Sequence, residues 1–153
     1  MSTNTVQGPR LRPATCEDVE VIADLRAVVM RPDLERLGRY DDHRVRQRLR
    51  DAYAPEHTSV VEAEDGTLAG CVAVRPSEDA WWLEHFYLAP EYQGGGIGTA
   101  VLTALLARAD AEGATVRLDV LRGSAARRLY ERHGFTVERE DSVDVYMVRP
   151  PGA

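Results

Sequence analysis

The sequence predicts one domain of the α+β class, with three layers in which helices flank a central, mixed and mostly antiparallel sheet. Its length of 153 residues is typical of a single domain. Along the chain the apolar residues change from helical spacing to alternation and back, which predicts helices and strands in an interleaved order. Residues 80–88 are apolar on both alternating sets, so we expect a central strand covered on both faces.

The first third of the chain predicts a short strand and a helical region. Leu11 opens the strand, and Thr15 with Asp18 three residues later has the pattern of a capping box. Apolar residues at helical spacing follow and predict a first helix. We expect Pro32 to end it, because proline lacks the N–H of a helical hydrogen bond and its ring clashes with the preceding turn. The polar stretch from there to Tyr53 predicts one or two short helices.

The middle of the chain predicts a hairpin followed by the central strand. Residues 58–63 and 68–74 are rich in β-branched and aliphatic side chains, and Asp65-Gly66 between them is a strong hairpin signal. The central strand, residues 80–88, is ended by Pro90. Strict alternation divides its apolar side chains into two faces, with Trp82, Phe86 and Leu88 on one and Trp81, Leu83 and Tyr87 on the other.

The last third of the chain predicts two helices and three strands. Residues 97–111 have apolar side chains at helical spacing, and residues 116–120 alternate as a strand. The remaining elements are a helix that ends at Gly134 and two final strands, at residues 125–133, 135–137 and 143–148.

The composition predicts a globular protein without a built-in attraction to polyanions. The formal net charge is −6, so we expect no nucleic-acid and no membrane partner, because either would bind against the field of the whole chain. All 19 basic residues are arginine, which excludes mechanisms that need a lysine Schiff base or a phosphate-loop lysine. Cys16 and Cys71 lack the spacing of metal ligands, so we expect free thiols and no metal.

The two ends of the chain are predicted to be tails. Residues 1–9 are polar and patternless, so we expect a disordered N-terminal tail, a domain at residues 10–149 and a short C-terminal tail at residues 150–153. The sequence has no secretory signal and no apolar run of the roughly 18 residues that span a membrane. The predicted location is therefore cytoplasmic.

The segment most informative about chemistry is the glycine-rich loop after the central strand, Gln93-Gly94-Gly95-Gly96-Ile97-Gly98-Thr99. The first N–H groups of a helix have no internal partner and the helix dipole favours negative charge, so this loop can bind a pyrophosphate. A turn without a ligand is the alternative. A phosphate-binding P-loop would need a lysine, and the dinucleotide fingerprint fails because Thr99 stands at its third glycine.

Two blocks of the sequence resemble the GNAT superfamily of acyl-CoA-dependent N-acyltransferases. The first is Gln93-x-x-Gly96-x-Gly98, which follows a strand ending in Leu-x-Pro. The second is Ala-Arg-Arg-Leu-Tyr-Glu-Arg-His-Gly-Phe at residues 126–135, which looks like the family's late helix with its tyrosine and closing Gly-Phe. The resemblance extends over residues 10–149 and is strongest in the second half. It implies a single-domain GNAT fold, two strands splayed at the acyl-CoA site, and acetyl-CoA as the acyl donor.

The resemblance also implies how acetyl-CoA is held. Main-chain groups of Phe86, Tyr87 and Leu88 would pair with the pantetheine arm like an added strand, and the thioester would enter a gap between this strand and residues 115–120. The family commonly has an asparagine where this chain has Gly123, followed by Ser124, which could substitute for it. The implied contacts to the pyrophosphate and the remaining cofactor are Gln93, Gly94, Gly95, Gly96, Ile97, Gly98, Thr99, Ser124 and Arg127.

Acetyl transfer to an amine needs a neutral nucleophile, a polarised carbonyl and a proton for the leaving thiolate. Tyr130 matches the family's usual general acid, and the alternative is a helix tyrosine with its hydroxyl at the surface. Glu84 is the leading base, acting directly or through water, and the alternative is a structural carboxylate bonded to an arginine. A strand amide near Phe86 would polarise the carbonyl. His85 is interpreted as a satisfied sheet histidine, and Cys71 as a core residue that carries no acyl group.

The acceptor is expected to be a small-molecule amine or an amino-acid-like compound. Specificity should come from the segments outside the resemblance, at residues 30–53, 76–79 and 141–146. Their carboxylates could attract a cationic amine, the candidates being Asp33, Glu35, Asp41, Asp42 and Asp144. The alternatives are a protein N-terminal or lysine acetyltransferase, a non-catalytic acyl-CoA-binding regulatory module and, disfavoured by the net charge, an enzyme acting on charged tRNA. A homodimer is a further expectation, since family members are often dimers.

Overall fold

The computed structural model describes residues 9–153, so the expected tail at residues 1–9 lies almost entirely outside it. Within the described residues, seven strands form one sheet in the order β1-β2-β3-β4-β5-β7-β6. Neighbouring strands are antiparallel except for the parallel pair β4 and β5. The predicted α+β class with a mixed, mostly antiparallel sheet is confirmed. The elements are β1 (Arg10–Pro13), α1 (Val19–Arg36), α2 (Asp42–Ala52), β2 (Thr58–Glu62), β3 (Leu68–Pro76), β4 (Trp81–Leu88), α3 (Ile97–Ala111), β5 (Val116–Leu121), α4 (Ala126–Arg132), β6 (Thr136–Glu140) and β7 (Asp144–Arg149).

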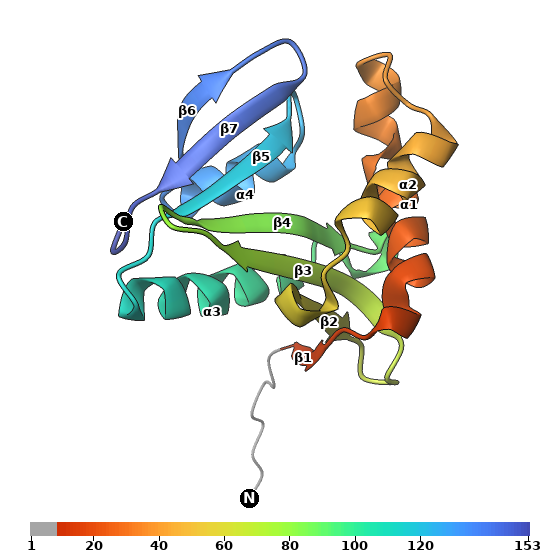
Figure 1. The fold of residues 1–153 in the computed structure, drawn as a ribbon, viewed down its shortest axis with the longest axis horizontal. Coiled ribbons are helices and arrows are strands. Elements are labelled where there is room, and N and C mark those ends of the chain that lie inside the picture. The colour runs from red at the N-terminus through yellow and green to blue at the C-terminus, as the bar shows by residue number, and fades with distance from the viewer. Residues whose placement is uncertain (1–8) are drawn as a thin grey trace, which may run out of the picture.

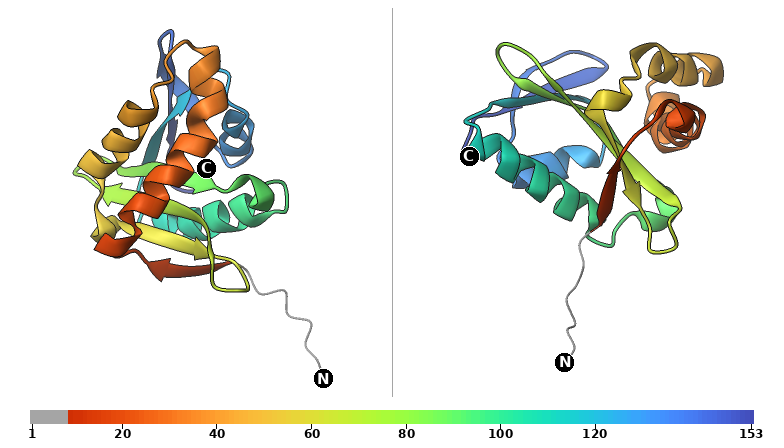
Figure 2. Two further views of the ribbon diagram at one scale, coloured as in Figure 1. Left: turned by 90° about the vertical axis from the view of Figure 1, so that its right-hand side faces the viewer. Right: turned by 60° about the horizontal axis from the view of Figure 1, so that its bottom comes forward.

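The sheet separates two layers of helices. Helices α1 and α2 lie on one face, and α3 and α4 lie on the other (Figures 1 and 2). Each layer has its own hydrophobic core, because the sheet is apolar on both faces. The core beneath α3 and α4 includes Leu102, Leu118, Phe135 and Met147. The core beneath α1 includes Ile22, Leu49, Val60 and Cys71.

The start of the first helical region agrees with the sequence, whereas its end does not. The predicted capping box is present, since the Thr15 hydroxyl accepts from the Glu17 amide and the Asp18 carboxylate accepts from the Thr15 amide. The prediction that Pro32 ends the helix is wrong, because α1 continues to Arg36. Pro32 and Val28 are both exposed, so water can satisfy the Val28 carbonyl that loses its helical partner. The loss of one hydrogen bond on the solvent side bends or weakens a helix without ending it.

The hairpin between β2 and β3 forms as predicted. Gly66 has a φ of +86°, which glycine adopts without steric cost. The Asp65 carboxylate accepts hydrogen bonds from the Thr67 amide at 3.0 Å and from its hydroxyl at 2.7 Å. This local bonding fixes the register that brings β3 beside β4.

The last residues, expected to be a tail, contact the domain. The guanidinium of buried Arg149 donates to the Ala153 carbonyl at 2.8 Å and to Asp110 of α3 at 2.7 Å. The Gly152 amide donates to the same Asp110 carboxylate at 2.8 Å. No helix within residues 9–153 is long and apolar enough to cross a membrane.

Candidate active site

The central feature of the site is the divergence of β4 from β5. The two strands pair only at their beginnings, where Trp81 faces Val116 and Trp82 faces Arg117. Beyond this point they separate (Figure 1), while β5 pairs along its whole length with β7. The edge of β4 that faces β5 therefore has main-chain groups without a strand partner after Trp82. The splay that the resemblance implies is present in the structure.

A β-bulge in β4 changes the direction of its side chains next to this divergence. Between the residues that face Cys71 and Ala73 of β3, β4 has one residue more than β3. His85 lies in the bulge with a φ of +48°, a conformation that non-glycine residues rarely adopt. As a result Phe86 packs in the core beneath α3 and Tyr87 in the core beneath α1. The two faces that strict alternation predicted for this strand are therefore wrong from the bulge onward.

A cavity of about 150 Å³ opens where the two strands diverge. Its walls come from α1, β4, β5 and the chain around the start of α4. Five of the residues predicted from the sequence line it together: Glu84, Phe86, Tyr87, Ser124 and Tyr130. Leu88, the glycine-rich loop and Arg127 lie outside this lining.

Tyr130 brings a protonated hydroxyl to the cavity. The residue is only 7% exposed, and its ring packs edge-on against Phe135 with the ring centres 5.6 Å apart. Burial, with a smaller contribution from Tyr87, raises the pKa of the Tyr130 hydroxyl above its usual value. The hydroxyl therefore keeps its proton at neutral pH, and the alternative of a surface tyrosine does not describe this residue.

Glu84 has features of both alternatives that the sequence left open, a base at the cavity and a structural carboxylate bonded to an arginine. It lines the cavity, and its Oε1 accepts hydrogen bonds from Arg75 Nη2 at 2.7 Å and Nε at 3.2 Å. The side chains of Glu84 and Arg75 are 31% and 48% exposed, so this ion pair is in contact with water. A hydrated pair fixes the direction of a carboxylate without removing its oxygens from the cavity. The role of Glu84 as the base stays a prediction.

The glycine-rich loop exposes main-chain amides beside open space. Gly94 and Gly96 have φ values of +79° and +88°, and a Cβ added at Gly94, Gly95 or Gly96 would meet no atom within 4 Å. Gly96 caps α3 without a side-chain hydrogen bond, and the Ala100 amide bonds to the Gly96 carbonyl at 3.0 Å. The three amides before Ala100 therefore have no helical partner, which fits a pyrophosphate at the start of α3.

Three other side chains that the resemblance assigns to acetyl-CoA have partners within the chain. Gln93 Nε2 donates to the Leu88 carbonyl at 2.9 Å and so fastens the loop to β4. Ser124 Oγ accepts from an amide at the start of α4 at 3.2 Å. Arg127 forms an ion pair with Glu131 at 3.3 Å. Their contacts to acetyl-CoA stay predictions.

His85 lies at the end of a hydrogen-bonded chain that reaches the cavity from α1. Its Nδ1 lies 3.2 Å from the Tyr87 hydroxyl, and that hydroxyl accepts from Arg26 Nε at 3.0 Å. Burial and then the charge of Arg26 lower the pKa of His85, so the imidazole is neutral at pH 7. Burial raises the pKa of Tyr87 to about 12. The partner on Nδ1 agrees with the interpretation of His85 as a satisfied sheet histidine.

Cys71 lies in the core beneath α1, as expected from its apolar strand. Its thiol donates to the His85 carbonyl at 3.2 Å. Burial raises the pKa of the Cys71 thiol to about 12. A thiol that stays protonated is a poor nucleophile, so the structure agrees with transfer that does not pass through this cysteine.

Asp119 is the residue at the cavity that the sequence analysis missed. It stands on β5 and lines the cavity together with Glu84. Although the residue as a whole is exposed, partial burial of its carboxylate, together with the neighbouring Asp144, raises the pKa of Asp119 to about 7. The sequence contains a feature that could have indicated Asp119. Alternation in β5 places this carboxylate on the face opposite the core residue Leu118.

Most carboxylates that were expected to attract a cationic amine already have partners. Four of the five accept a hydrogen bond from a neighbouring arginine side chain, tyrosine or main-chain amide. These four are Asp33, Glu35, Asp41 and Asp42. Asp144 instead stands opposite Leu121 in the β5–β7 ladder and is a neighbour of Asp119. The carboxylates that line the reaction cavity are therefore Asp33 of α1, Glu84 of β4 and Asp119 of β5.

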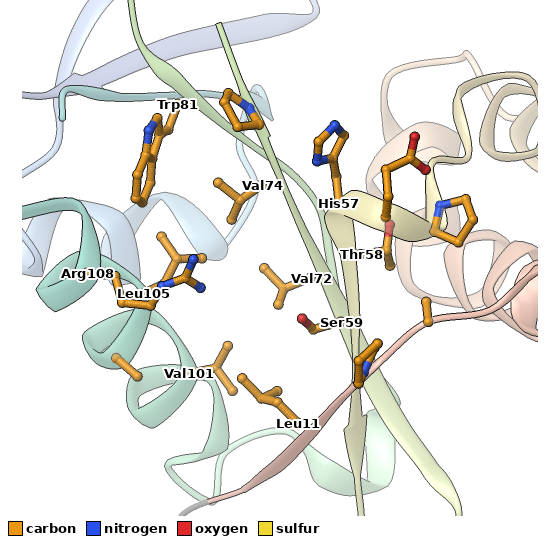
Figure 3. A pocket seen from close by; sticks show the side chains of 16 residues that line it. Leu11, His57, Thr58, Ser59, Val72, Val74, Trp81, Val101, Leu105 and Arg108 are labelled. Carbon is orange, nitrogen blue, oxygen red and sulfur yellow. The ribbon is translucent and has the colours of Figure 1, made fainter. Parts of the chain in front are cut away.

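A second cavity, of about 490 Å³, lies between α3 and the strands β1 to β3 (Figure 3). Its walls are mostly apolar and include Leu11, Val72, Val74, Val101 and Leu105. It shares no lining residue with the cavity of Glu84 and Tyr130. The predicted catalytic residues Glu84 and Tyr130 therefore line the smaller cavity between β4 and β5 and not this one.

Comparisons with known proteins address the family of this chain. The Acetyltransferase (GNAT) family matches residues 22–135. The PaiA N-acetyltransferase from Thermoplasma acidophilum, solved in complex with coenzyme A, aligns with a TM-score of 0.75 and 23% identity over 94% of this chain and 99% of that chain. The ribosomal-protein-S18-alanine N-acetyltransferase from Escherichia coli aligns with a TM-score of 0.71 and 17% identity over 95% of each chain.

A third solved structure, the histone acetyltransferase HPA2 and related acetyltransferase from Corynebacterium glutamicum, aligns with a TM-score of 0.70 and 20% identity over 96% of this chain and 98% of that chain. At these identities the structural matches show a shared fold. The family match covers most of the chain and includes both the glycine-rich loop and Tyr130. The chain therefore belongs to the GNAT family of acetyltransferases and is an acyl-transferring enzyme that uses acetyl-CoA as its acyl donor.

Proposed function

We propose that this enzyme transfers an acetyl group from acetyl-CoA to a primary amine of a small-molecule or amino-acid-like acceptor by direct attack. The observation that carries the proposal is that Glu84 and Tyr130 line one cavity where β4 and β5 diverge. A base and an acid are needed at the same reacting centre, because the amine must lose a proton while the leaving sulfur gains one. Bound acetyl-CoA supplies the acyl group in activated form, as a thioester.

Each step has a residue suited to it. Glu84 accepts the proton of the amine, directly or through a water molecule, with its carboxylate oriented by Arg75. A main-chain amide of β4 near Phe86 donates a hydrogen bond to the carbonyl oxygen. Tyr130 holds a proton at its hydroxyl for the leaving sulfur, and the raised pKa of this group supports that role. The amides before Ala100 bind the pyrophosphate at the start of α3.

The dimensions of the acceptor side favour a small molecule over a protein. Next to the reaction cavity lies a pocket of about 580 Å³ between the α1–α2 connection and the β6–β7 turn. Small-molecule sites commonly have volumes of about 300–1,000 Å³. Residues of both connections line this pocket, and its volume supports an acceptor of small-molecule size.

Thermal unfolding with and without acetyl-CoA tests the donor site, and release of free thiol with a panel of amines tests the transfer. A ligand present at 100 times its Kd should add about 2.7 kcal/mol to the apparent free energy of unfolding. We expect a clear rise of Tm with acetyl-CoA and a smaller effect with adenosine. If acetyl-CoA binds but no amine increases thiol release above hydrolysis, the chain is an acyl-CoA-binding module and the proposed transfer is wrong.

A further inference from the structure

The pocket of about 580 Å³ beside the reaction cavity is assembled from three separate parts of the chain. One wall is α1 with the α1–α2 connection, another is the first half of α2, and the third is the β6–β7 turn. Leu121 of β5 lines both this pocket and the reaction cavity. Asp144 of β7 lines the pocket and neighbours Asp119, which lines the cavity. A molecule could therefore extend from one space into the other.

Four arginines line this pocket: Arg26, Arg39, Arg44 and Arg48. Arg44 and Arg48 are one helical turn apart, so both project from the same side of α2. Among the contacts within residues 9–153, none of the four forms an ion pair with a carboxylate. Arg26 donates to the neutral Tyr87 hydroxyl and the Val45 carbonyl. Arg26 is therefore held within the chain, and the guanidinium groups of Arg39, Arg44 and Arg48 are the remaining ones without an ion pair in this pocket among the described residues.

The other arginines of α2 behave differently. Arg46 pairs with Asp42 and Asp24, and Arg50 pairs with Glu20. These pairs tie α2 to α1 and neutralise one side of the helix. The chain carries 25 acidic and 19 basic residues, so carboxylates for pairing are not scarce. The side of α2 that faces the pocket nevertheless keeps its positive charge.

The carboxylates of the pocket are held mainly by main-chain amides. Asp41 caps α2 by accepting from the Arg44 amide at 2.8 Å. Asp141 accepts from the amides of Val143 and Asp144 at 2.8 and 2.7 Å. These amide bonds lower the pKa of Asp141, and the charges of Arg139 and Arg39 lower it to a smaller extent. The acids therefore shape the walls, and the guanidinium groups remain to bind a ligand.

We propose that the acceptor carries an anionic group, a carboxylate or a phosphate, and that Arg39, Arg44 and Arg48 bind this group in the pocket. Guanidinium groups bind both anions through paired, charge-assisted hydrogen bonds. The amine of the same molecule would then lie toward Glu84 and Asp119 in the reaction cavity. This inference rests on the proposed function. The sequence analysis expected carboxylates to attract a cationic amine, whereas here the enzyme recognises two groups of the acceptor, its anionic group and its amine.

Binding of the anion can be measured without turnover. Inorganic phosphate and, separately, propionate are titrated at constant ionic strength, and the arginine side-chain Nε–Hε NMR signals are followed. We expect saturable shifts of the signals that disappear in the R44Q/R48Q variant. The control is R46Q, which removes one charge from the same helix outside the pocket and should keep the saturable shifts. Shifts that are linear and equal for all arginines would overturn the proposal.

Transfer to matched amines tests whether the anion belongs to the acceptor. Thiol release is measured with β-alanine against β-alaninamide and with phosphoethanolamine against ethanolamine, and the two pairs distinguish a carboxylate from a phosphate. We expect kcat/KM to be about tenfold or more higher for the anionic member of one pair, mainly through KM. R44Q/R48Q should abolish this preference and R46Q should keep it.

Equal kcat/KM within both pairs, or a preference that R44Q/R48Q retains, would overturn the proposal that the anion belongs to the acceptor. Failure of the proposed function would look different. It would appear as a wild type whose Tm does not rise with acetyl-CoA, whereas the binding of phosphate is measured without acetyl-CoA and tests the arginine pocket alone.

Discussion

The two sides of the reaction cavity are built from different kinds of groups. On the donor side the groups are main-chain amides, those at the start of α3 and those on the free edge of β4. On the acceptor side they are charged side chains, carried by α1, α2, β5 and β7. These donor-side amides lie within residues 86–99, whereas the acceptor side draws on segments more than one hundred residues apart.

This difference determines how each side responds to substitution. A site made of amides depends on backbone conformation, so it is damaged where a glycine with positive φ is replaced. A site made of side chains depends on charge, so it can change its ligand through one substitution while the fold persists. Effects on acetyl-CoA binding and on acceptor use should therefore separate cleanly between the two sides. The following experiments test that separation, and the groups between the two sides are expected to give the largest effects.

Tyr130→Phe should give the largest loss. Removal of a general acid slows transfer by about 100- to 10,000-fold, whereas the rise of Tm with acetyl-CoA should stay close to that of the wild type. Steady-state kinetics and thermal unfolding measure the two effects. Tyr92→Phe is the matched control, since it removes a hydroxyl next to the glycine-rich loop and outside the reaction cavity. Normal kcat with weaker acetyl-CoA binding in Tyr130→Phe would show that the tyrosine serves the donor side alone.

Glu84→Gln should give the next largest loss, about 100-fold in kcat. The comparison with Arg75→Gln separates a base from a structural carboxylate, because both variants break the same ion pair and only one removes the carboxylate. An exposed pair of this kind contributes about 0–1 kcal/mol to stability, so both variants should fold. If Glu84 is the base, Arg75→Gln should lose less than tenfold in kcat. Equal losses in the two variants would assign Glu84 a structural role.

Residues on the donor side could be predicted because their function is local in sequence. The loop Gln93 to Thr99 needs only a strand before it and a helix after it, and both are visible in the hydrophobic pattern. The bounds of α3 were predicted at both ends. The bulge at His85 could not be predicted, since no glycine marks it and it becomes visible only in the pairing of β4 with β3.

Gly96→Ala should have an intermediate effect that is confined to the donor side. Alanine at a φ of +88° costs about 1–2 kcal/mol, and relief of this strain would turn the amides at the start of α3. We expect the KM for acetyl-CoA to rise about tenfold with little change for the acceptor. Gly113→Ala is the matched control, because Gly113 also has a positive φ, +67°, and open space around it, but lies after the end of α3. It should lose the same stability and keep its KM.

The acceptor side was predictable only as a set of segments. The segments at residues 30–53 and 141–146 do line the pocket and the cavity, but the charge assigned to them was negative. The structure pairs most of those carboxylates locally and leaves Arg39, Arg44 and Arg48 without acidic partners among the described residues. Which charges cancel depends on contacts such as Arg46 with Asp24, 22 residues apart. Such pairing leaves no signature in a single sequence.

The smallest effect we expect concerns the pair Asp119 and Asp144 on the acceptor side. The pKa of Asp119 in the folded protein is about 7, above the usual value of 3.8, because of burial and its neighbour. The folded state therefore binds this proton more tightly than the unfolded state does. The contribution of Asp119 to stability is fully present at low pH and is lost as pH rises through about 7.

Asp119→Asn removes the titrating group and mimics its protonated form. Its Tm should equal that of the wild type near pH 4 and exceed it at pH 8. Because the residue is exposed on one side, hydration limits the gain to a small shift. A Tm difference that does not change between pH 4 and pH 8 would mean that the pKa of Asp119 is not raised in the folded protein.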